Sequence, residues 1–358
     1  MSITSHPNAS DTPNPPARRR FLTQAGLAAL GGGLLAGAGW AIRKRDASLW
    51  QVQRERGLMG TSVSITCLAG DRETAATAID AAFAHMAAVV AELTHFDAAS
   101  PLSRLNRDGR LSFVPAHLHA VLREARSISG LTDGAFDATV LPELRYFETL
   151  HGIAGLDASQ RATIARRRQL VDYRDVALDA AGVRFGKPGM SVTLDGIAKG
   201  YVVDQGIATL QAAGIEYAIV DAGGDTRTIC GSDPNRHWNV GIVDPQDVSR
   251  VAVVVQVRNA ALSTSGNYRV FFSTDRRLFH IVDPHAGESP QAYSSVTVVA
   301  ERSVMADGLS TGTFSMPLPQ LAALMQAHEH QWLVFSRTGD RRWRSRDLPL
   351  VAGKAELV

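Results

Sequence analysis

The segment from Thr193 to Asp204, TLDGIAKGYVVD, constrains this chain more than any other stretch. A short apolar–polar alternation before Gly196 predicts a strand, and the spacing after it predicts a helix that continues to Leu210. Such a turn gathers backbone N–H groups and the positive end of a helix dipole at one point. Lys199 falls in the first turn, where a cation is unfavourable unless an anion lies close by. The segment therefore indicates a phosphate site; the alternative is an ordinary strand–helix junction with a solvated lysine.

The hydrophobic pattern of the other segments predicts helices and strands without strict alternation. Helices are expected over residues 73–93 and 115–130, from near Asp157, and over 304–311. Strands are expected over 62–67, 217–222, 238–243, 251–257 and 295–300, with another that ends at 280–284. Residues 94–106 are expected to form a loop and 263–268 a polar turn. The mixture predicts an α+β fold with mixed α/β layers and not a doubly wound parallel sheet.

Composition argues against a nucleic-acid-binding protein and against a disulfide-rich one. The chain has 358 residues, 45% of them hydrophobic, and a net charge of +2, which describes a globular protein with no general attraction to nucleic acid. Cys67 and Cys230 are the two cysteines. They give neither a disulfide framework nor the spacing of a metal site, so they are expected to be structural, with a single disulfide between them as the alternative.

The N-terminal region has a different character. Residues 1–17 are rich in proline, serine and asparagine and are expected to be disordered. The consecutive arginines Arg18 to Arg20, followed by Phe21-Leu22 and a glycine- and alanine-rich run to Ile42, are typical of a twin-arginine export signal. The run is also long enough to cross about 30 Å of hydrocarbon, so an uncleaved inner-membrane anchor is the alternative. We expect a leader over 1–45, one domain over 50–358, and a periplasmic location.

Three polar residues near the C-terminal end predict a metal site. Asp307, Ser310 and Thr311 stand at i, i+3 and i+4, so a helix places their side chains on one face. One carboxylate with hydroxyls is a sparse oxygen set that suits Mg²⁺, which completes its coordination with water and substrate phosphates. It suits zinc poorly, because no histidine or cysteine cluster accompanies it. The alternative is a helix start whose hydroxyls are satisfied locally.

His280, three residues before Asp283-Pro284, is a candidate general base because the pKa of histidine lies near working pH. The chain has 11 histidines, so the residue type alone does not separate a catalytic histidine from a structural one.

Read together, these segments resemble the ApbE family of FAD:protein FMN transferases. The matching motifs, in the family's order between about residues 57 and 315, are Met59-Gly60-Thr61, Ser100 to Asn106, Gly134 to Val140, Gly196 to Asp204, Gly223-Gly224-Asp225, Ser265 to Tyr268, His280 to Pro284 and Ala306 to Thr311. Each motif is weak by itself, but their order makes chance agreement very improbable.

The resemblance implies an enzyme that splits the pyrophosphate of FAD, attaches FMN through a phosphoester to a threonine or serine of an acceptor flavoprotein, and releases AMP. A membrane electron-transfer subunit is the acceptor class that it suggests. By motif matching, the flavin contacts would be Met59, Phe96, Ala135, Phe136, Asp137, Lys199 and Ile281. Asp307, Thr311 and the backbone carbonyl of Gly196 would bind Mg²⁺, and His280 would activate the acceptor hydroxyl.

The chain departs from the family's pattern at two places. Family members often carry aspartate where this chain has Thr193, and here an aspartate appears at Asp195 instead. This variant of the motif is similar to the subgroup that includes the NosX proteins, accessory to periplasmic nitrous oxide reduction. Phe96 replaces a tyrosine common in the family, which keeps ring stacking and loses a hydroxyl.

Two other functions are compatible with the same residues. One is a flavin-carrying accessory protein of a periplasmic or membrane redox system, which holds FAD without chemistry. The other is an FAD pyrophosphatase, in which water replaces the acceptor hydroxyl. Lys199, His280, Asp307 and Thr311 favour an enzyme, because flavin binding alone needs neither metal ligands nor a base.

Overall fold

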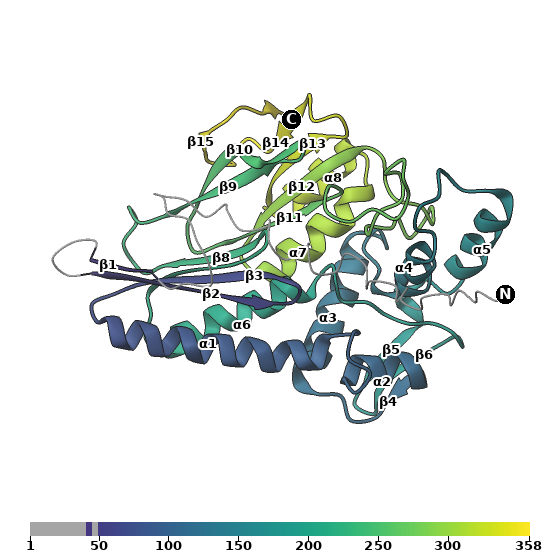
Figure 1. Cartoon of the computed structure of the whole chain (residues 1–358), viewed down its shortest axis with the longest axis horizontal. Coiled ribbons are helices and arrows are strands. Elements are labelled where there is room, and N and C mark those ends of the chain that lie inside the picture. Colours follow the sequence, from purple (N-terminus) through teal and green to yellow (C-terminus); the bar gives the residue numbers. More distant parts are fainter. Residues whose placement is uncertain (1–40, 45–48) are drawn as a thin grey trace, which may run out of the picture.

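A computed structural model of the chain describes residues 41–44 and 49–358 (Figure 1). The predicted disordered stretch 1–17 and most of the export signal lie outside the described residues. The final residues assigned to the leader, Ala41–Lys44, form strand β1, which pairs antiparallel with β2 (Trp50–Leu58).

The described residues form a ten-stranded sheet that is antiparallel except at one edge. Its order is β1, β2, β3 (Thr61–Ala69), β7 (Tyr217–Ala222), β8 (Asp225–Cys230), β11 (Ala261–Gly266), β12 (Tyr293–Ala300), β13 (Gln331–Ser336), β14 (Arg342–Arg344) and β16 (Glu356–Leu357). The parallel pair is β14 with β16. Hairpins such as β2–β3 and β7–β8 explain this antiparallel order, because neighbouring strands are joined by short turns.

Helices cover one face of this sheet (Figure 1): α1 (Arg72–Leu93), α3 (Ala116–Leu131), α6 (Ala198–Ala212) and α7 (Ser303–Gly312). Val63, Ile65 and Cys67 of β3 are fully buried in the core beneath them, as their alternation predicts. By length and composition α1 could cross a membrane, since it has 22 residues and a mean hydropathy of 1.4. Its predicted role as a core helix is nevertheless confirmed, because Phe83 and Met86 are buried in the same core.

A small sheet covers part of the opposite face of the large sheet. It consists of β15 (Leu350–Ala352), β10 (Asp247–Val257) and β9 (Trp238–Asp244), with β10 in the centre as its uninterrupted apolar run predicts. Val253 and Val255 of β10 pack with Leu262 and Phe335 of the large sheet. Helices, large sheet and small sheet thus form layers, and the predicted α+β class is confirmed.

The remaining elements surround the helix layer. They are α2 (Pro101–Asp108), α4 (Leu141–Glu148), α5 (Ala158–Arg168), α8 (Leu318–Ala327), the short 3₁₀ segments at Ala138–Val140, Tyr173–Asp175 and Thr313–Ser315, and a third sheet of β4 (Arg110–Leu111), β6 (Gly182–Phe185) and β5 (Val176–Asp179). Asp157 caps α5 at the predicted position. Cys67 and Cys230 are buried free thiols, so the two cysteines are structural and no disulfide joins them.

Four local predictions were wrong, three of them because tertiary contacts replaced a local pattern. Part of the expected loop 94–106 is helix α2, capped by the Ser100 hydroxyl. The polar residues 263–268 begin as strand β11, which lies between β8 and β12. No strand precedes Gly196, since the Val192 backbone bonds the side chain of Asn106 at 2.7 and 2.8 Å. Residues 280–284 likewise form an irregular loop and not the end of a strand. The residue before this loop, Phe279, donates its backbone N–H to the Ser289 hydroxyl.

Gly200 lets α6 and α7 approach closely. A Cβ at Gly200 would clash with the Ser303 carbonyl oxygen and stand 2.8 Å from the Cβ of Asp307. We expect Gly200→Ala to lower the free energy of unfolding by about 1–3 kcal/mol, because the packed helices must separate. Gly130→Ala is the matched helical control, since a Cβ there meets nothing within 4 Å and should be neutral or stabilising. Equal denaturant midpoints for the two variants would contradict this expectation.

Candidate active site

Lys199 lies in the first turn of α6, as the sequence predicts. Its Nζ forms an ion pair with Asp225 at the start of β8, and the other carboxylate oxygen of Asp225 accepts a hydrogen bond from the Ser263 hydroxyl. The Asp225 side chain is 1% exposed and that of Lys199 is 33% exposed. Burial lowers the pKa of Lys199, but the Asp225 and Asp307 carboxylates outweigh it and hold the pKa above its ordinary value. Lys199 is therefore a fixed cation with a buried counter-ion.

Asp307 on α7 faces the same helix start. Its Oδ2 accepts the backbone N–H of Gly200 at 2.9 Å, while within the described part of the chain its Oδ1 has no hydrogen-bond partner. Burial raises the pKa of Asp307 to about 7, the Asp225 charge adds to the rise, and the Lys199 charge opposes it. The site thus holds a buried carboxylate with one oxygen left for a ligand.

Thr311, one turn beyond Asp307, lies against Gly196. A Cβ at Gly196 would stand 2.9 Å from the Thr311 Cγ2, so glycine allows the backbone and this side chain to meet. The Thr311 hydroxyl lies 3.1 Å from the Ser265 Oγ, which is also 2.8 Å from the Ser310 Oγ. Gly196 and Thr311, two of the predicted metal ligands, therefore lie in contact although they come from distant segments. The Ser310 hydroxyl is hydrogen-bonded to Ser265.

The donor chemistry fits Mg²⁺. Within residues 41–44 and 49–358, no group of three or more His, Cys, Asp or Glu side chains could hold a metal ion. The available donors are instead one carboxylate, one hydroxyl and one backbone carbonyl, from Asp307, Thr311 and Gly196. Such a sparse oxygen set suits Mg²⁺, which keeps several waters and takes the rest of its ligands from substrate phosphates.

His280 lies in the irregular loop after Phe279, and its Nδ1 is buried without a hydrogen-bond partner among the described residues. Burial lowers the pKa of His280 to about 4. The Lys199 and Arg269 charges lower it further, against the Val270 carbonyl and the Asp195 charge, which raise it. The imidazole is therefore neutral near pH 7, and it lies close enough to Lys199 for that charge to lower its pKa.

His95 and Asp195 form a pair that the sequence did not predict. The Nε2 of His95 lies 2.9 Å from the Oδ2 of Asp195, and the Thr193 hydroxyl accepts the Asp195 backbone N–H at 3.2 Å. Partial burial raises the pKa of Asp195, but the hydrogen bond and charge of His95 hold it below its ordinary value. Phe96, expected to contact flavin, stacks on His95 with ring centroids 4.0 Å apart and is 80% exposed. Its ring face is available to a ligand.

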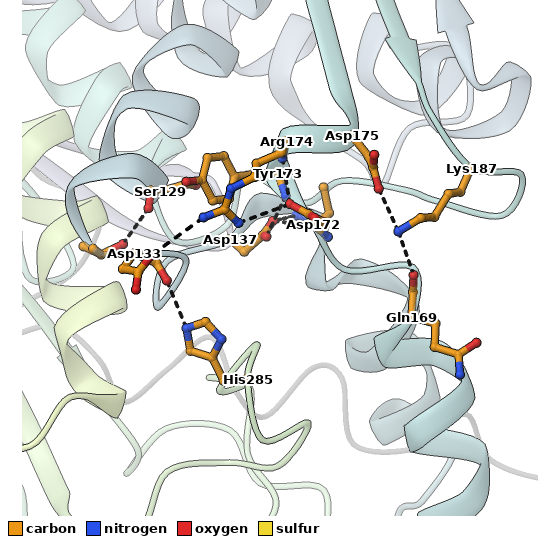
Figure 2. A network of polar contacts seen from close by, with 12 residues as sticks. Ser129, Asp133, Asp137, Gln169, Asp172, Tyr173, Arg174, Asp175, Lys187 and His285 are labelled. Carbon is orange, nitrogen blue, oxygen red and sulfur yellow. Dashed lines mark hydrogen bonds and ion pairs between the residues drawn. The ribbon is translucent and has the colours of Figure 1, made fainter.

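The segment from Gly134 to Asp137 joins the α3 end to the loop around Tyr173 (Figure 2). Asp137 accepts hydrogen bonds from the Thr139 backbone and hydroxyl at 2.8 and 2.6 Å and from the Tyr173 N–H at 2.8 Å. Burial raises the pKa of Asp137, although these bonds oppose the rise. On the other side, His285 contacts the Asp133 carbonyl at 3.1 Å. The hydrogen bonds of Asp137 therefore fix the backbone of this segment.

The other predicted flavin contacts differ in exposure. Met59 and Gly60 have φ values of 54° and 71° and form the tight turn between β2 and β3. The next residue, Thr61, packs its side chain against Gly223. Ala135, Phe136 and Ile281 are buried, at 9%, 4% and 5% exposure, and Phe136 packs closely on Gly312 of α7. These buried residues shape the walls, while Met59 and Phe96 remain partly or largely accessible.

Sequence reasoning missed the partners of the predicted residues. Asp225 and His95 lie 26 and 100 positions away from the residues they contact. The signal for Asp225 was its place directly after Gly223-Gly224, where φ values of 67° and 114° make the sharp turn into β8. For His95 no sequence pattern pointed to Asp195.

Comparison with known proteins gives a family for this arrangement. The family model described as the ApbE family matches residues 59–335. The chain is similar to the FAD:protein FMN transferase of Haemophilus influenzae, 30% identical over 241 residues, 63% of this chain and 68% of that protein. It is also similar to the FAD:protein FMN transferase of Vibrio cholerae, 29% identical over 303 residues, 81% of this chain and 89% of that protein.

Solved structures agree with the sequence relatives. The ApbE protein of Thermotoga maritima superposes with a TM-score of 0.73 at 26% identity, covering 83% of this chain and 97% of that one. The flavin transferase ApbE of Vibrio cholerae gives a TM-score of 0.69 at 27% identity, covering 83% and 98%.

Proposed function

The chain belongs to the ApbE family, and we propose that it is a Mg²⁺-dependent FAD:protein FMN transferase. In this proposal FAD is cleaved, AMP leaves, and FMN becomes attached by a phosphoester bond to a threonine or serine of an acceptor flavoprotein. The observation that carries the proposal is the meeting of Lys199, Asp307, Thr311 and Gly196 around one point, although they come from segments more than 100 residues apart.

Charge neutralisation is the main task of such a site. Asp307, Thr311 and the Gly196 carbonyl would hold Mg²⁺, which when bound stabilises negative charge on phosphate oxygens. Lys199, kept protonated by Asp225, contributes a fixed positive charge beside the start of α6. Preorganised charges of this kind lower the barrier because they need no rearrangement when charge develops.

His280 supplies the base. Its neutral imidazole would accept the proton of the acceptor hydroxyl while that oxygen attacks the phosphorus of the FMN half of FAD. The bond between this phosphorus and the oxygen bridging to the AMP phosphate then breaks, and AMP carries that oxygen away. Burial keeps the imidazole unprotonated, so it is ready to act at neutral pH.

We also propose where the enzyme works. The consecutive arginines and the apolar run before residue 42 favour export by the twin-arginine route, with an uncleaved inner-membrane anchor as the other outcome. A periplasm-exposed threonine or serine on a membrane electron-transfer subunit is then the proposed acceptor. Fractionation of cells that express the full chain, with N-terminal sequencing of the product, tests location and cleavage together.

One experiment separates the proposed activity from its alternatives. The purified chain is incubated with FAD, Mg²⁺ and a candidate acceptor, AMP is quantified, and the acceptor is weighed by mass spectrometry. A transferase releases AMP and adds the mass of FMN to the acceptor. Free FMN with AMP would indicate a pyrophosphatase, and bound FAD without AMP would indicate an accessory flavin carrier; either result would overturn the proposal.

We expect His280→Ala to slow FMN transfer by about 10²–10⁴-fold with FAD affinity nearly unchanged, because it removes the base and no flavin contact. The wild-type rate should not fall near the ordinary histidine pKa of 6.5. At Mg²⁺ concentrations that keep the Asp307 carboxylate ionised, it should fall only as the pH drops toward about 4, where the imidazole becomes protonated. A pH–rate profile of single turnovers checks this, with His328→Ala as the control on a distant part of the chain. A parallel loss of FAD affinity would assign His280 to binding instead.

A further inference from the structure

Arg269 is an exposed arginine that directly follows Tyr268, just beyond strand β11. Its Nη2 lies 4.0 Å from the point where a Cβ on Gly224 would stand, so the guanidinium lies over the glycine turn that leads to Asp225. It also lies beside the Tyr268 side chain, whose pKa burial raises and the Arg269 charge lowers. Within residues 41–44 and 49–358, Arg269 forms no ion pair with a carboxylate.

Arg269 lies close to several charged groups of the candidate active site, so its positive charge is available to an anionic ligand there. Its positive charge lowers the pKa of both Lys199 and His280, so the guanidinium lies within electrostatic range of the candidate active site. Lys199 is already paired with buried Asp225. Asp307 raises the pKa of Lys199 and Asp195 raises that of His280, so both add negative charge nearby. The two negative charges of a diphosphate would add to those of Asp195, Asp225 and Asp307, and Lys199 with a bound Mg²⁺ would not offset them all, so a further cation would stabilise the complex.

We propose that Arg269 binds the diphosphate of the flavin dinucleotide and supplies a positive charge that, unlike that of Lys199, is not shared with a carboxylate among the described residues. This inference rests on the proposed function, because it takes FAD as the substrate. A guanidinium suits the role, since its planar fork donates two parallel hydrogen bonds to phosphate oxygens and it stays charged at any working pH.

The test compares ligands that share the flavin ring and ribityl chain, where only FAD carries the diphosphate and the adenosine. Dissociation constants of FAD and riboflavin are measured by flavin fluorescence at fixed salt for wild type, Arg269→Gln, Arg269→Lys and Arg250→Gln. Arg250 is an exposed arginine on β10 and controls for net charge. We expect Arg269→Gln to weaken FAD binding by about 10- to 100-fold and riboflavin binding by less than about twofold, with Arg269→Lys intermediate. Arg250→Gln should match the wild type.

The outcomes separate this inference from the proposed function. Unchanged FAD affinity in Arg269→Gln, or an equal loss for FAD and riboflavin, would overturn the phosphate role even if the wild type transfers FMN normally. Conversely, a selective loss of FAD affinity supports the role of Arg269 even if the wild type releases no AMP with any acceptor, a result that would count against the transferase. Circular dichroism of Arg269→Gln should match the wild type, because the side chain is exposed.

Discussion

Asp307→Asn should reduce metal-dependent release of AMP by about 10²–10⁴-fold, because it removes the carboxylate that we assign to Mg²⁺. The substitution is close to isosteric. The amide oxygen can still accept the Gly200 N–H that Asp307 now binds at 2.9 Å, so the contact between α6 and α7 is retained. The measurement is AMP formed per enzyme as a function of Mg²⁺ concentration, at saturating FAD.

Stability separates a lost ligand from a damaged fold. In wild type without metal, Asp307 is a buried carboxylate whose pKa is raised by burial and by Asp225, so its ionised form costs free energy in the fold. Asp307→Asn removes that cost, and its free energy of unfolding without metal should equal or exceed that of wild type at pH 8. Asp108→Asn, at the exposed end of α2, should leave both turnover and stability unchanged. Undiminished turnover of Asp307→Asn across the Mg²⁺ titration would refute the assigned ligand.

Asp225→Asn should lower the free energy of unfolding by about 2–4 kcal/mol, one of the larger single effects in this chain. Asp225 is 1% exposed and forms the ion pair with Lys199, so its neutralisation leaves the partly buried ammonium without its ion-pair partner. Breaking a fully buried pair costs about 3–5 kcal/mol. The expected loss of stability is smaller for this pair because the Lys199 side chain is 33% exposed. Urea denaturation at pH 7 measures the difference.

A double-mutant cycle shows whether the loss comes from this pair. Lys199→Met combined with Asp225→Asn should lose at least about 1 kcal/mol less than the sum of the single variants, because the unpaired charge is gone. Glu356→Gln provides the surface control: it removes the Arg341–Glu356 pair, whose side chains are 56% and 55% exposed, and should cost under about 1 kcal/mol. An additive cycle would mean that the Lys199 charge is stabilised by other groups.

Local patterns predicted the regular elements well wherever a segment is amphipathic on its own. The alternation at Val63, Ile65 and Cys67 predicted β3, and the spacing from Ile79 to Met86 predicted α1, since both depend only on which side chains must leave water. The failures lie where polar residues enter the sheet or where loops are fixed by distant partners. β11 carries serine and threonine because the Ser263 hydroxyl bonds Asp225 and the Thr264 hydroxyl bonds Thr297, pairings that its own sequence cannot reveal.

The order of the motifs indicated the family and the residues around which the candidate site is built. The mixture of helix and strand patterns indicated the α+β class, because residue type and spacing suffice to state what each segment can form. Tertiary structure alone decided how those residues are used. Lys199 forms an ion pair with Asp225, and His95 bonds Asp195. Arg269 lies over the glycine turn and forms no ion pair with a carboxylate of the described residues. The physical reason is that charge pairing and desolvation depend on distances across the fold, which segments 26 to 100 residues apart acquire only when the sheet and helices pack together.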